Sequence, residues 1–330
     1  QPDCIAGGVV ALSVKDFSVL AAATYPSYDL AKLTEPGYYS QLANDKANPL
    51  FNRAFQGAFA PGSIFKPLVA CGALEEGVLT TEDKIKCVGI YHYPGHNFTT
   101  KCLGVHGNAD LNYAMAKSCN VYFSEAGRRL GIENMNLYAK RFGLGVKTGI
   151  ELTETTGILA GPEYSRSIGS RWSNLVTIKA AIGQSDNQFS PLQLATYVAT
   201  IANGGNRYRP HLIRKITDYR RENIVMENNP DSPELVETAG VSEEHLNMVK
   251  TAMRQVVLSG TATNFNGYMV PVAAKTGTAQ NNGSDHTTFI CFAPYENPEI
   301  AIAVVVEHGA KGMVSKIVAK DIMDAYFSNK

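Results

Sequence analysis

The chain has 330 residues, of which 45% are hydrophobic and 18% are charged. A chain of this length and apolar content can bury one large core or two adjacent lobes. Lys and Arg together number 30, as do Asp and Glu, so the formal net charge is zero. This balance argues against nucleic-acid binding driven by neutralisation of phosphates, and we expect no nucleic-acid partner.

The longest uninterrupted apolar run, at 300–306, is much shorter than the ~20 residues needed to cross a bilayer, and it indicates a buried strand. The first residue is Gln1 rather than Met, and no signal peptide is recognisable. We therefore expect an excised domain whose targeting segment lies outside this sequence.

The predicted elements place strands at both ends of the chain and helices between them. Two apolar runs separated by a polar turn predict a β-hairpin at 9–14 and 18–23. Apolar residues at helical spacing predict helices at 63–77, 110–117, 121–130, 134–142, 190–203 and 242–258. Three further strands and a last helix are predicted at 270–274, 287–293, 300–307 and 314–326. Irregular connections are predicted at 25–60, 80–108 and 150–170.

This order predicts an α/β fold in which one sheet, built from both chain ends and covered by the last helix, lies beside an all-helical lobe. No linker-like segment interrupts the chain, so we expect a single domain over 1–330 with two lobes. The sheet lobe comprises about 1–60 and 260–330, and the helical lobe comprises about 63–258.

Ser63 and Lys66 form an S-x-x-K motif at the start of a predicted helix. Positions i and i+3 lie on one face of a helix, so the lysine amine is expected within reach of the serine hydroxyl. A serine needs such a base to act as a nucleophile. The positive end of the helix dipole favours the alkoxide and lowers the pKa of the lysine. The motif is short and also occurs on ordinary helices, so it gains weight only beside other motifs.

An S-x-N motif is formed by Ser118 and Asn120 at the break between two predicted helices, where side chains can point into a cleft. A second S-x-N triplet, 185–187, lies just ahead of the capping box at Ser190. We therefore choose Ser118 and Asn120.

A K-T-G-T motif follows the apolar run at 270–274 and consists of Lys275, Thr276, Gly277 and Thr278. An edge strand in this position can pair with an extended peptide through main-chain hydrogen bonds. The alternative K-T-G triplet at 147–149 lies in a connector after a helix stop, so we choose the later motif.

The motif order S-x-x-K, S-x-N and K-T-G resembles that of the penicillin-binding proteins and serine β-lactamases. Several other stretches are similar to the monofunctional class B penicillin-binding proteins of the elongation or sporulation type: 7–12, 60–63, 191–195, 203–205 and 275–280. The chain departs from the family pattern at Ser185, where family members usually have Gly after the stretch 182–184.

The resemblance implies the transpeptidase fold of that family, with an antiparallel sheet, and a serine D,D-transpeptidase that crosslinks peptidoglycan stem peptides. By this resemblance, Ser63 attacks the carbonyl between the last two D-alanines, and D-alanine leaves. Lys66 takes the serine proton, Ser118 relays a proton to the leaving amine, and Asn120 holds the peptide amide.

The resemblance also implies that Lys275, Thr276 and Thr278 bind the terminal carboxylate, and that the N–H groups of Ser63 and Thr278 form the oxyanion hole. No cofactor is implied for catalysis. The implied partners are stem peptides ending in D-Ala-D-Ala, β-lactam antibiotics, and a membrane glycosyltransferase reached through regions outside this sequence. The implied location is the extracytoplasmic face of the bacterial membrane, with an N-terminal anchor helix and a pedestal domain outside this sequence.

Two other functions remain open at this point. A serine β-lactamase needs a base for fast deacylation, but the contexts of Glu151 and Glu154 do not resemble the class A deacylation motif. A β-lactam sensor domain resembles the class D pattern, which has a hydrophobic residue in place of Asn120.

A cluster of metal-ligand residue types borders the S-x-N motif: Cys87, Cys102, His106 and Cys119. The spacing of Cys102 and His106 is typical of tetrahedral zinc sites, so we predict a structural zinc here. His92 and His96 are reserve ligands. A Cys87–Cys102 disulfide and reduced, unliganded thiols are the alternatives.

Overall fold

The computed structural model describes residues 4–280, 283–309 and 312–328. Its central feature is a five-stranded sheet in the order β11-β12-β13-β1-β2, in which every neighbouring pair is antiparallel. The strands are β1 (Ala6–Ser13), β2 (Val19–Tyr25), β11 (Ala273–Ala279), β12 (His286–Ala293) and β13 (Ile300–Glu307). The N-terminal hairpin thus pairs with the C-terminal strands, which confirms the predicted sheet built from both chain ends.

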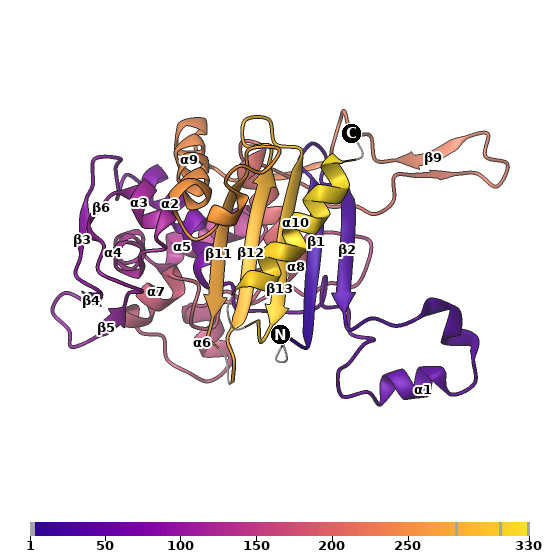
Figure 1. Cartoon of the computed structure of the whole chain (residues 1–330), viewed down its shortest axis with the longest axis horizontal. Coiled ribbons are helices and arrows are strands. Elements are labelled where there is room, and N and C mark those ends of the chain that lie inside the picture. Colours follow the sequence, from indigo (N-terminus) through magenta and orange to yellow (C-terminus); the bar gives the residue numbers. More distant parts are fainter. Residues whose placement is uncertain (1–3, 281–282, 310–311, 329–330) are drawn as a thin grey trace.

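Two helices cover the faces of this sheet, α10 (Met313–Phe327) in front and α8 (Pro191–Ala202) behind (Figure 1). Because both faces are covered, β13 is apolar and buried along nearly its whole length. The helix α8 is buried at every residue and begins with the predicted capping box of Ser190 and Gln193.

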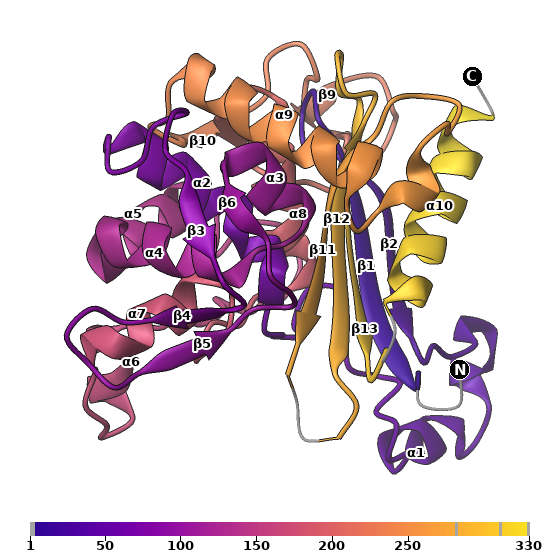
Figure 2. The same ribbon diagram turned by 60° about the vertical axis from the view of Figure 1, so that its left-hand side comes forward.

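Most of the remaining helices form a layer beside the sheet edge at β11 (Figure 2), whereas α1 (Tyr38–Ala43) lies beyond β2 (Figure 1). The largest are α2 (Lys66–Glu75), α4 (Asn120–Leu130), α5 (Ile132–Arg141), α7 (Asn174–Ala181) and α9 (Glu243–Ser259). The α2 helix lies inside this layer, with every residue from Lys66 to Leu74 buried. The edge strand β11 therefore faces a helical lobe rather than open solvent.

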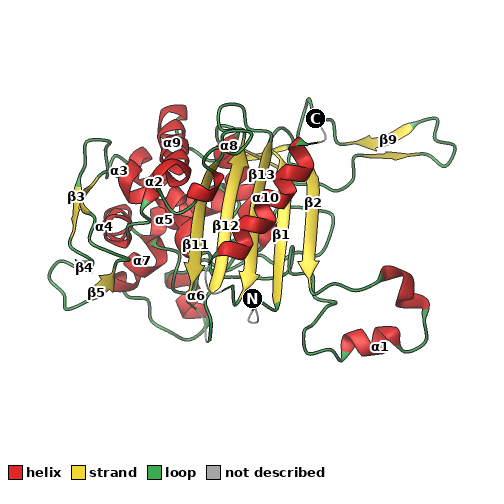
Figure 3. Ribbon diagram, in the orientation of Figure 1, coloured by secondary structure: helices red, strands yellow, loops and turns green. Residues whose placement is uncertain are grey.

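Shorter elements complete the fold (Figure 3). The short helices are η1 (Leu30–Thr34), α1 (Tyr38–Ala43), η2 (Gly62–Phe65), α3 (Leu111–Ala116), α6 (Pro162–Ser167) and η3 (Thr263–Phe265). The two-stranded ladders are β3 (Ile85–Cys87) with β6 (Gly107–Ala109), β4 (Ile90–His92) with β5 (Thr99–Lys101), β7 (Asn206–Tyr208) with β10 (Leu235–Thr238), and β8 (Lys215–Thr217) with β9 (Ile224–Glu227). Within the described part of the chain, no helix combines the length and apolar character needed to cross a bilayer.

The structure corrects several predicted elements. The three segments predicted to be irregular contain η1 and α1, the ladders β3–β6 and β4–β5, and α6. The helix predicted from Ser63 begins as the 3-10 turn η2 before α2. Neither α7 nor the strands β7 to β10 were predicted.

The strand predicted at 270–274 begins later and runs further, over Ala273–Ala279. Pro271 has no N–H to donate to a ladder, so pairing starts after it. Pairing with β12 uses only backbone groups, so it continues through the polar residues. The K-T-G-T motif is therefore inside the strand rather than after it.

Candidate active site

The catalytic serine and lysine of the sequence prediction lie in one turn, where η2 passes into α2. The backbone N–H of Lys66 donates to the Ser63 carbonyl. The Lys66 side chain is fully buried, and its Nζ reaches the Ser118 carbonyl (2.8 Å), Ser118 Oγ (3.1 Å) and Asn120 Oδ1 (2.7 Å). In this structure the amine is therefore directed at the S-x-N motif, and none of its hydrogen bonds goes to the Ser63 hydroxyl.

Burial lowers the pKa of Lys66 to about 7, and the nearby Cys119 and Cys102 oppose this shift. An amine with this pKa is about half neutral at pH 7 and mostly neutral above it, so it can accept a proton. The neutral amine keeps two N–H donors, enough for the Ser118 carbonyl and Asn120 Oδ1. Its lone pair is left for a proton.

Ser118 lies between the end of α3 and the start of α4, in the left-handed region with φ of 54°. Non-glycine residues rarely adopt this conformation, and its occurrence here turns the buried hydroxyl toward the lysines. Ser118 Oγ accepts a hydrogen bond from Nζ of Lys275 at 3.0 Å, and it lies 3.1 Å from Nζ of Lys66. When Lys66 is neutral, the Ser118 hydroxyl can donate its proton to the Lys66 lone pair, so the two groups can exchange a proton.

Lys275 is fully buried in β11, and its Nζ also donates to the Thr276 carbonyl at 3.1 Å. Burial, together with the neighbouring Lys66, lowers the pKa of Lys275 well below its ordinary value. Two amines that share one hydroxyl repel each other when both are protonated. A proton on either amine therefore disfavours a proton on the other.

Glycines allow the turn of Ser63 to lie directly against β11. A side chain on Gly62, whose φ is 59°, would begin 2.5 Å from the Thr278 carbonyl oxygen. A side chain on Gly277 would meet the Pro61 carbonyl oxygen at 2.8 Å. Thr288 on β12 completes this contact by donating to the same Pro61 oxygen at 2.7 Å. The turn that contains Ser63 therefore packs directly against the backbone of Thr278.

The two alternative triplets have other hydrogen bonds. The side-chain amide of Asn187 is buried and forms two hydrogen bonds with the backbone. It accepts from the Ala160 N–H and donates to the Ala180 carbonyl. Thr148, in the connector triplet 147–149, donates through N–H and hydroxyl to the Glu154 carboxylate. These hydrogen bonds fix local turns, and among the described residues neither triplet forms a hydrogen bond with the Lys66 amine.

Sequence reasoning missed two side chains at this site. Gln184 donates to the Thr278 carbonyl at 3.2 Å, and Thr261 pairs with Thr276, hydroxyl to hydroxyl, at 2.6 Å. Ser185, next to Gln184, has a φ of 68°, a conformation in which glycine is common. This geometry explains why the family pattern has Gly there.

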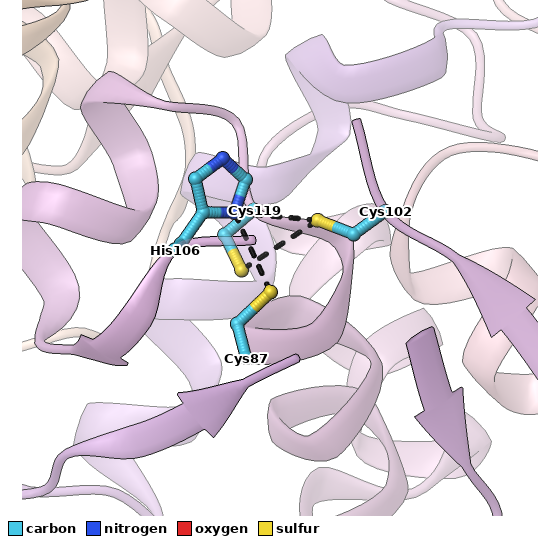
Figure 4. Close-up of side chains that lie close together, drawn as sticks. All are labelled: Cys87, Cys102, His106 and Cys119. Atoms are coloured by element: carbon cyan, nitrogen blue, oxygen red, sulfur yellow. Dashed lines mark hydrogen bonds between the residues drawn. The ribbon is translucent and has the colours of Figure 1, made fainter. Parts of the chain in front are cut away.

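The four predicted metal ligands form a compact cluster, with all ligand atoms within 4.8 Å of one another (Figure 4). His106 Nδ1 lies 3.5 Å from Cys87 Sγ and 3.4 Å from Cys102 Sγ, and the Cys102 and Cys119 sulfurs are 3.8 Å apart. A tetrahedron with Zn–S of about 2.3 Å and Zn–N of about 2.0 Å has edges of roughly 3.5 to 3.8 Å. The residues therefore fit a zinc ion.

The cluster contacts the S-x-N motif, because Asn120 N–H donates to Cys102 Sγ at 3.2 Å. The reserve ligands lie apart from it: His92 is exposed on β4, and His96 packs against Tyr93. All six cysteines are free, so the Cys87–Cys102 disulfide is not formed.

The model of one protein family, described as the penicillin binding protein transpeptidase domain, matches residues 7–324. Curated relatives include the peptidoglycan D,D-transpeptidases MrdA of Acinetobacter baumannii (34% identity, covering 96% of this chain and 50% of the relative) and of Haemophilus influenzae (32%, covering 98% and 53%). The chain thus spans about half the length of these relatives.

Solved structures similar to this chain include Pseudomonas aeruginosa PBP2 in complex with WCK 5153, with a TM-score of 0.87 and 32% identity, covering 98% of this chain and 71% of that one. Another is the penicillin G acyl-enzyme complex of penicillin-binding protein A from M. tuberculosis, with a TM-score of 0.85 and 27% identity, covering 99% and 76%. A third, at a TM-score of 0.85 and 29% identity, covering 98% and 56%, belongs to a peptidoglycan synthase complex that coordinates polymerization and crosslinking. The family match and these likenesses agree with the motif geometry, and the chain belongs to the penicillin-binding protein transpeptidase family.

Proposed function

We propose that this chain is the single, two-lobed transpeptidase domain of a serine D,D-transpeptidase that crosslinks peptidoglycan stem peptides. β-Lactams acylate the same serine. The observation that carries the proposal is the position of Ser118 Oγ between the amines of Lys66 and Lys275. Family membership and the D,D-transpeptidase names of the curated relatives support it.

Acylation begins when Ser63 Oγ attacks the carbonyl between the two terminal D-alanines. The serine proton passes to the neutral amine of Lys66, and the new ester bond forms as the C–N bond breaks. Ser118 gives its hydroxyl proton to the leaving amine and is reprotonated by Lys66, which carries the proton taken from Ser63. D-Alanine leaves as a neutral amine, and the amine of a neighbouring stem then attacks the ester and restores Ser63.

Groups on β11 and η2 stabilise the two negative charges of the substrate, the terminal carboxylate and the developing oxyanion. The terminal carboxylate lies near the amine of Lys275 and the hydroxyls of Thr276 and Thr278. The N–H groups of Ser63 and Thr278 point at the oxyanion that develops during attack. The close packing of Gly62 on β11 supports this role, because it places both backbones side by side. Asn120, held by Lys66, orients the peptide amide.

The proposal extends to the context of the whole protein. We infer that the domain works on the extracytoplasmic face of the bacterial membrane, and that a membrane glycosyltransferase supplies the glycan strands. The likeness to a chain of a peptidoglycan synthase complex supports this partner. Both inferences concern regions beyond the transpeptidase domain.

Labelled benzylpenicillin tests the proposal. We expect intact-protein mass to increase by one penicillin per chain, and the adduct to be long-lived. The two carboxylates that could serve as a deacylating base are engaged elsewhere: Glu154 holds the turn at Thr148, and Glu151 accepts from the backbone N–H groups of Leu212 and Ile213. Hydrolysis faster than about one turnover per second would instead identify a β-lactamase.

We also propose that Cys87, Cys102, His106 and Cys119 hold a structural zinc ion. The distances that fit a tetrahedron support it, as does the position of the cluster. The only regular structure in the described segment 80–108 is two short ladders, β3–β6 and β4–β5, which are marginal on their own. A metal would fix this segment against the start of α4 and hold Asn120 through the sulfur of Cys102.

Elemental analysis of protein purified without added metal is expected to give one zinc per chain. Cys102→Ser should remove it, lower the melting temperature by about 5 °C, and slow acylation of Ser63, because the cluster and the S-x-N turn loosen together. Cys4→Ser is the matched control, since Cys4 lies outside the cluster. A zinc-free protein with Cys87 linked to Cys102 in a non-reducing peptide map would replace the metal with the disulfide.

A further inference from the structure

The hydroxyl of Thr276 has a partner from outside the three motifs. Thr261 Oγ1 lies 2.6 Å from Thr276 Oγ1, and either atom can be the donor. Thr261 follows the end of α9, where Gly260 is the C-cap residue. The Thr261 side chain is exposed and that of Thr276 is half-buried, so a ligand can approach this hydroxyl pair.

The segment that carries Thr261 is fixed against the S-x-N turn. Nζ of Lys117, the residue before Ser118, donates to the Ser259 carbonyl at 2.8 Å. A side chain on Gly260 would begin 2.4 Å from the Ala116 carbonyl oxygen, so only glycine permits this approach. The segment 259–261 therefore connects the S-x-N turn to the K-T-G strand.

We propose that Thr261 is a positioning residue that aims the Thr276 hydroxyl at the substrate carboxylate. This inference rests on the proposed function, in which Thr276 binds that carboxylate. A hydroxyl has one hydrogen and two lone pairs. If Thr276 is to donate to a carboxylate, its oxygen must accept from Thr261. The Thr261 hydroxyl is then the donor, and the bond it gives polarises the Thr276 hydroxyl toward the ligand.

A hydrogen bond between two accessible hydroxyls adds little to folding stability, because water replaces either partner. Its consequence is instead directional, since it fixes which way one proton points. This separates a positioning role from a structural one. A structural role would affect every ligand of Ser63, whereas a positioning role affects only ligands that carry the carboxylate.

The experiment compares acylation of the protein by benzylpenicillin and by benzylpenicillin methyl ester, which lacks the negative charge. Thr261→Val removes the hydroxyl at nearly constant volume, and Thr261→Ser retains it. Thr263→Val is the matched control, because Thr263 is an exposed threonine in η3 with no side-chain hydrogen bond among the described residues. Second-order rate constants are followed by intact-protein mass.

We expect Thr261→Val to slow acylation by benzylpenicillin roughly tenfold, the effect of losing about one hydrogen bond that supports a charged ligand. Its rate with the methyl ester should stay within about twofold of the parent chain. Thr261→Ser should restore the benzylpenicillin rate. In a Thr276→Val background, Thr261→Val should have no further effect, because the hydroxyl that it aims is gone.

Equal losses with the acid and the ester would show a structural role and overturn the inference, as would an unchanged benzylpenicillin rate in Thr261→Val. Additive effects of the two valine substitutions would also contradict it. Failure of the proposed function gives a different result, since benzylpenicillin would then not add to Ser63 of the unsubstituted chain at all.

Discussion

Ser63→Ala is expected to abolish the covalent addition of benzylpenicillin, which intact-protein mass detects as loss of the adduct peak. The reason is that the ester bond forms only at the hydroxyl oxygen of Ser63, and alanine offers no nucleophile. The free energy of unfolding should change by less than about 0.5 kcal/mol, since the Ser63 side chain is only half-buried and makes no hydrogen bond among the described residues.

Ser185→Ala is the matched control for this substitution. Ser185 begins the alternative S-x-N triplet, and we expect its replacement to leave the penicillin adduct in place. A Ser63→Ala protein that still gains one penicillin would show that the nucleophile is a different residue. Loss of the adduct in Ser185→Ala instead would mean that the wrong S-x-N triplet was chosen.

Lys66→Met is expected to reduce the acylation rate by about 10³- to 10⁴-fold, because it removes the base and also releases Ser118 and Asn120 from their shared donor. The base acts in its neutral form. With the pKa of Lys66 at about 7, the neutral fraction rises about tenfold per pH unit below pH 7 and levels off above it. The acylation rate of the unsubstituted chain should follow that curve.

A pH–rate profile checks this prediction. The rise through pH 7 should disappear in Lys66→Met and persist in Lys147→Met, which replaces an exposed lysine in the alternative K-T-G triplet. A profile that is flat in the unsubstituted chain, or one that still rises in Lys66→Met, would assign the titration to another group. Both variants should give the same circular dichroism spectrum as the parent, which separates lost chemistry from lost folding.

The sequence predicts the long elements of this fold because their apolar patterns are strong. The hairpin at the N-terminus, the capping box at Ser190 and the apolar strand β13 all follow from local composition. The ladders β3–β6 and β4–β5 do not, since each strand has three residues and forms only through contacts made elsewhere. The α7 helix, with sequence NLVTIKAA, contains β-branched residues that lower helix propensity, and it is stabilised by packing on α4.

The three motifs of the site are visible in the sequence, but their geometry is not. The spacing of Ser63 and Lys66 predicts that the amine faces the serine, whereas the structure directs it to Ser118 and Asn120. That arrangement depends on how α2 packs between the other helices. Thr261 has no local signal, because a threonine after a helix is common. Only the close contact between the end of α9 and β11 gives it a partner.

The position of β1 between β13 and β2 has a consequence for the order in which the molecule can fold. The strand β1 cannot pair with β13 until nearly the whole chain has emerged from the ribosome. The turn that carries Ser63 also forms its contact with the sheet late, because the Thr288 hydroxyl that donates to the Pro61 carbonyl lies 227 residues further along the chain. Contacts of such high sequence separation form late and slowly. The helical lobe can therefore collapse early around α2, while the ability to form an acyl-enzyme is among the last properties that the nascent chain acquires.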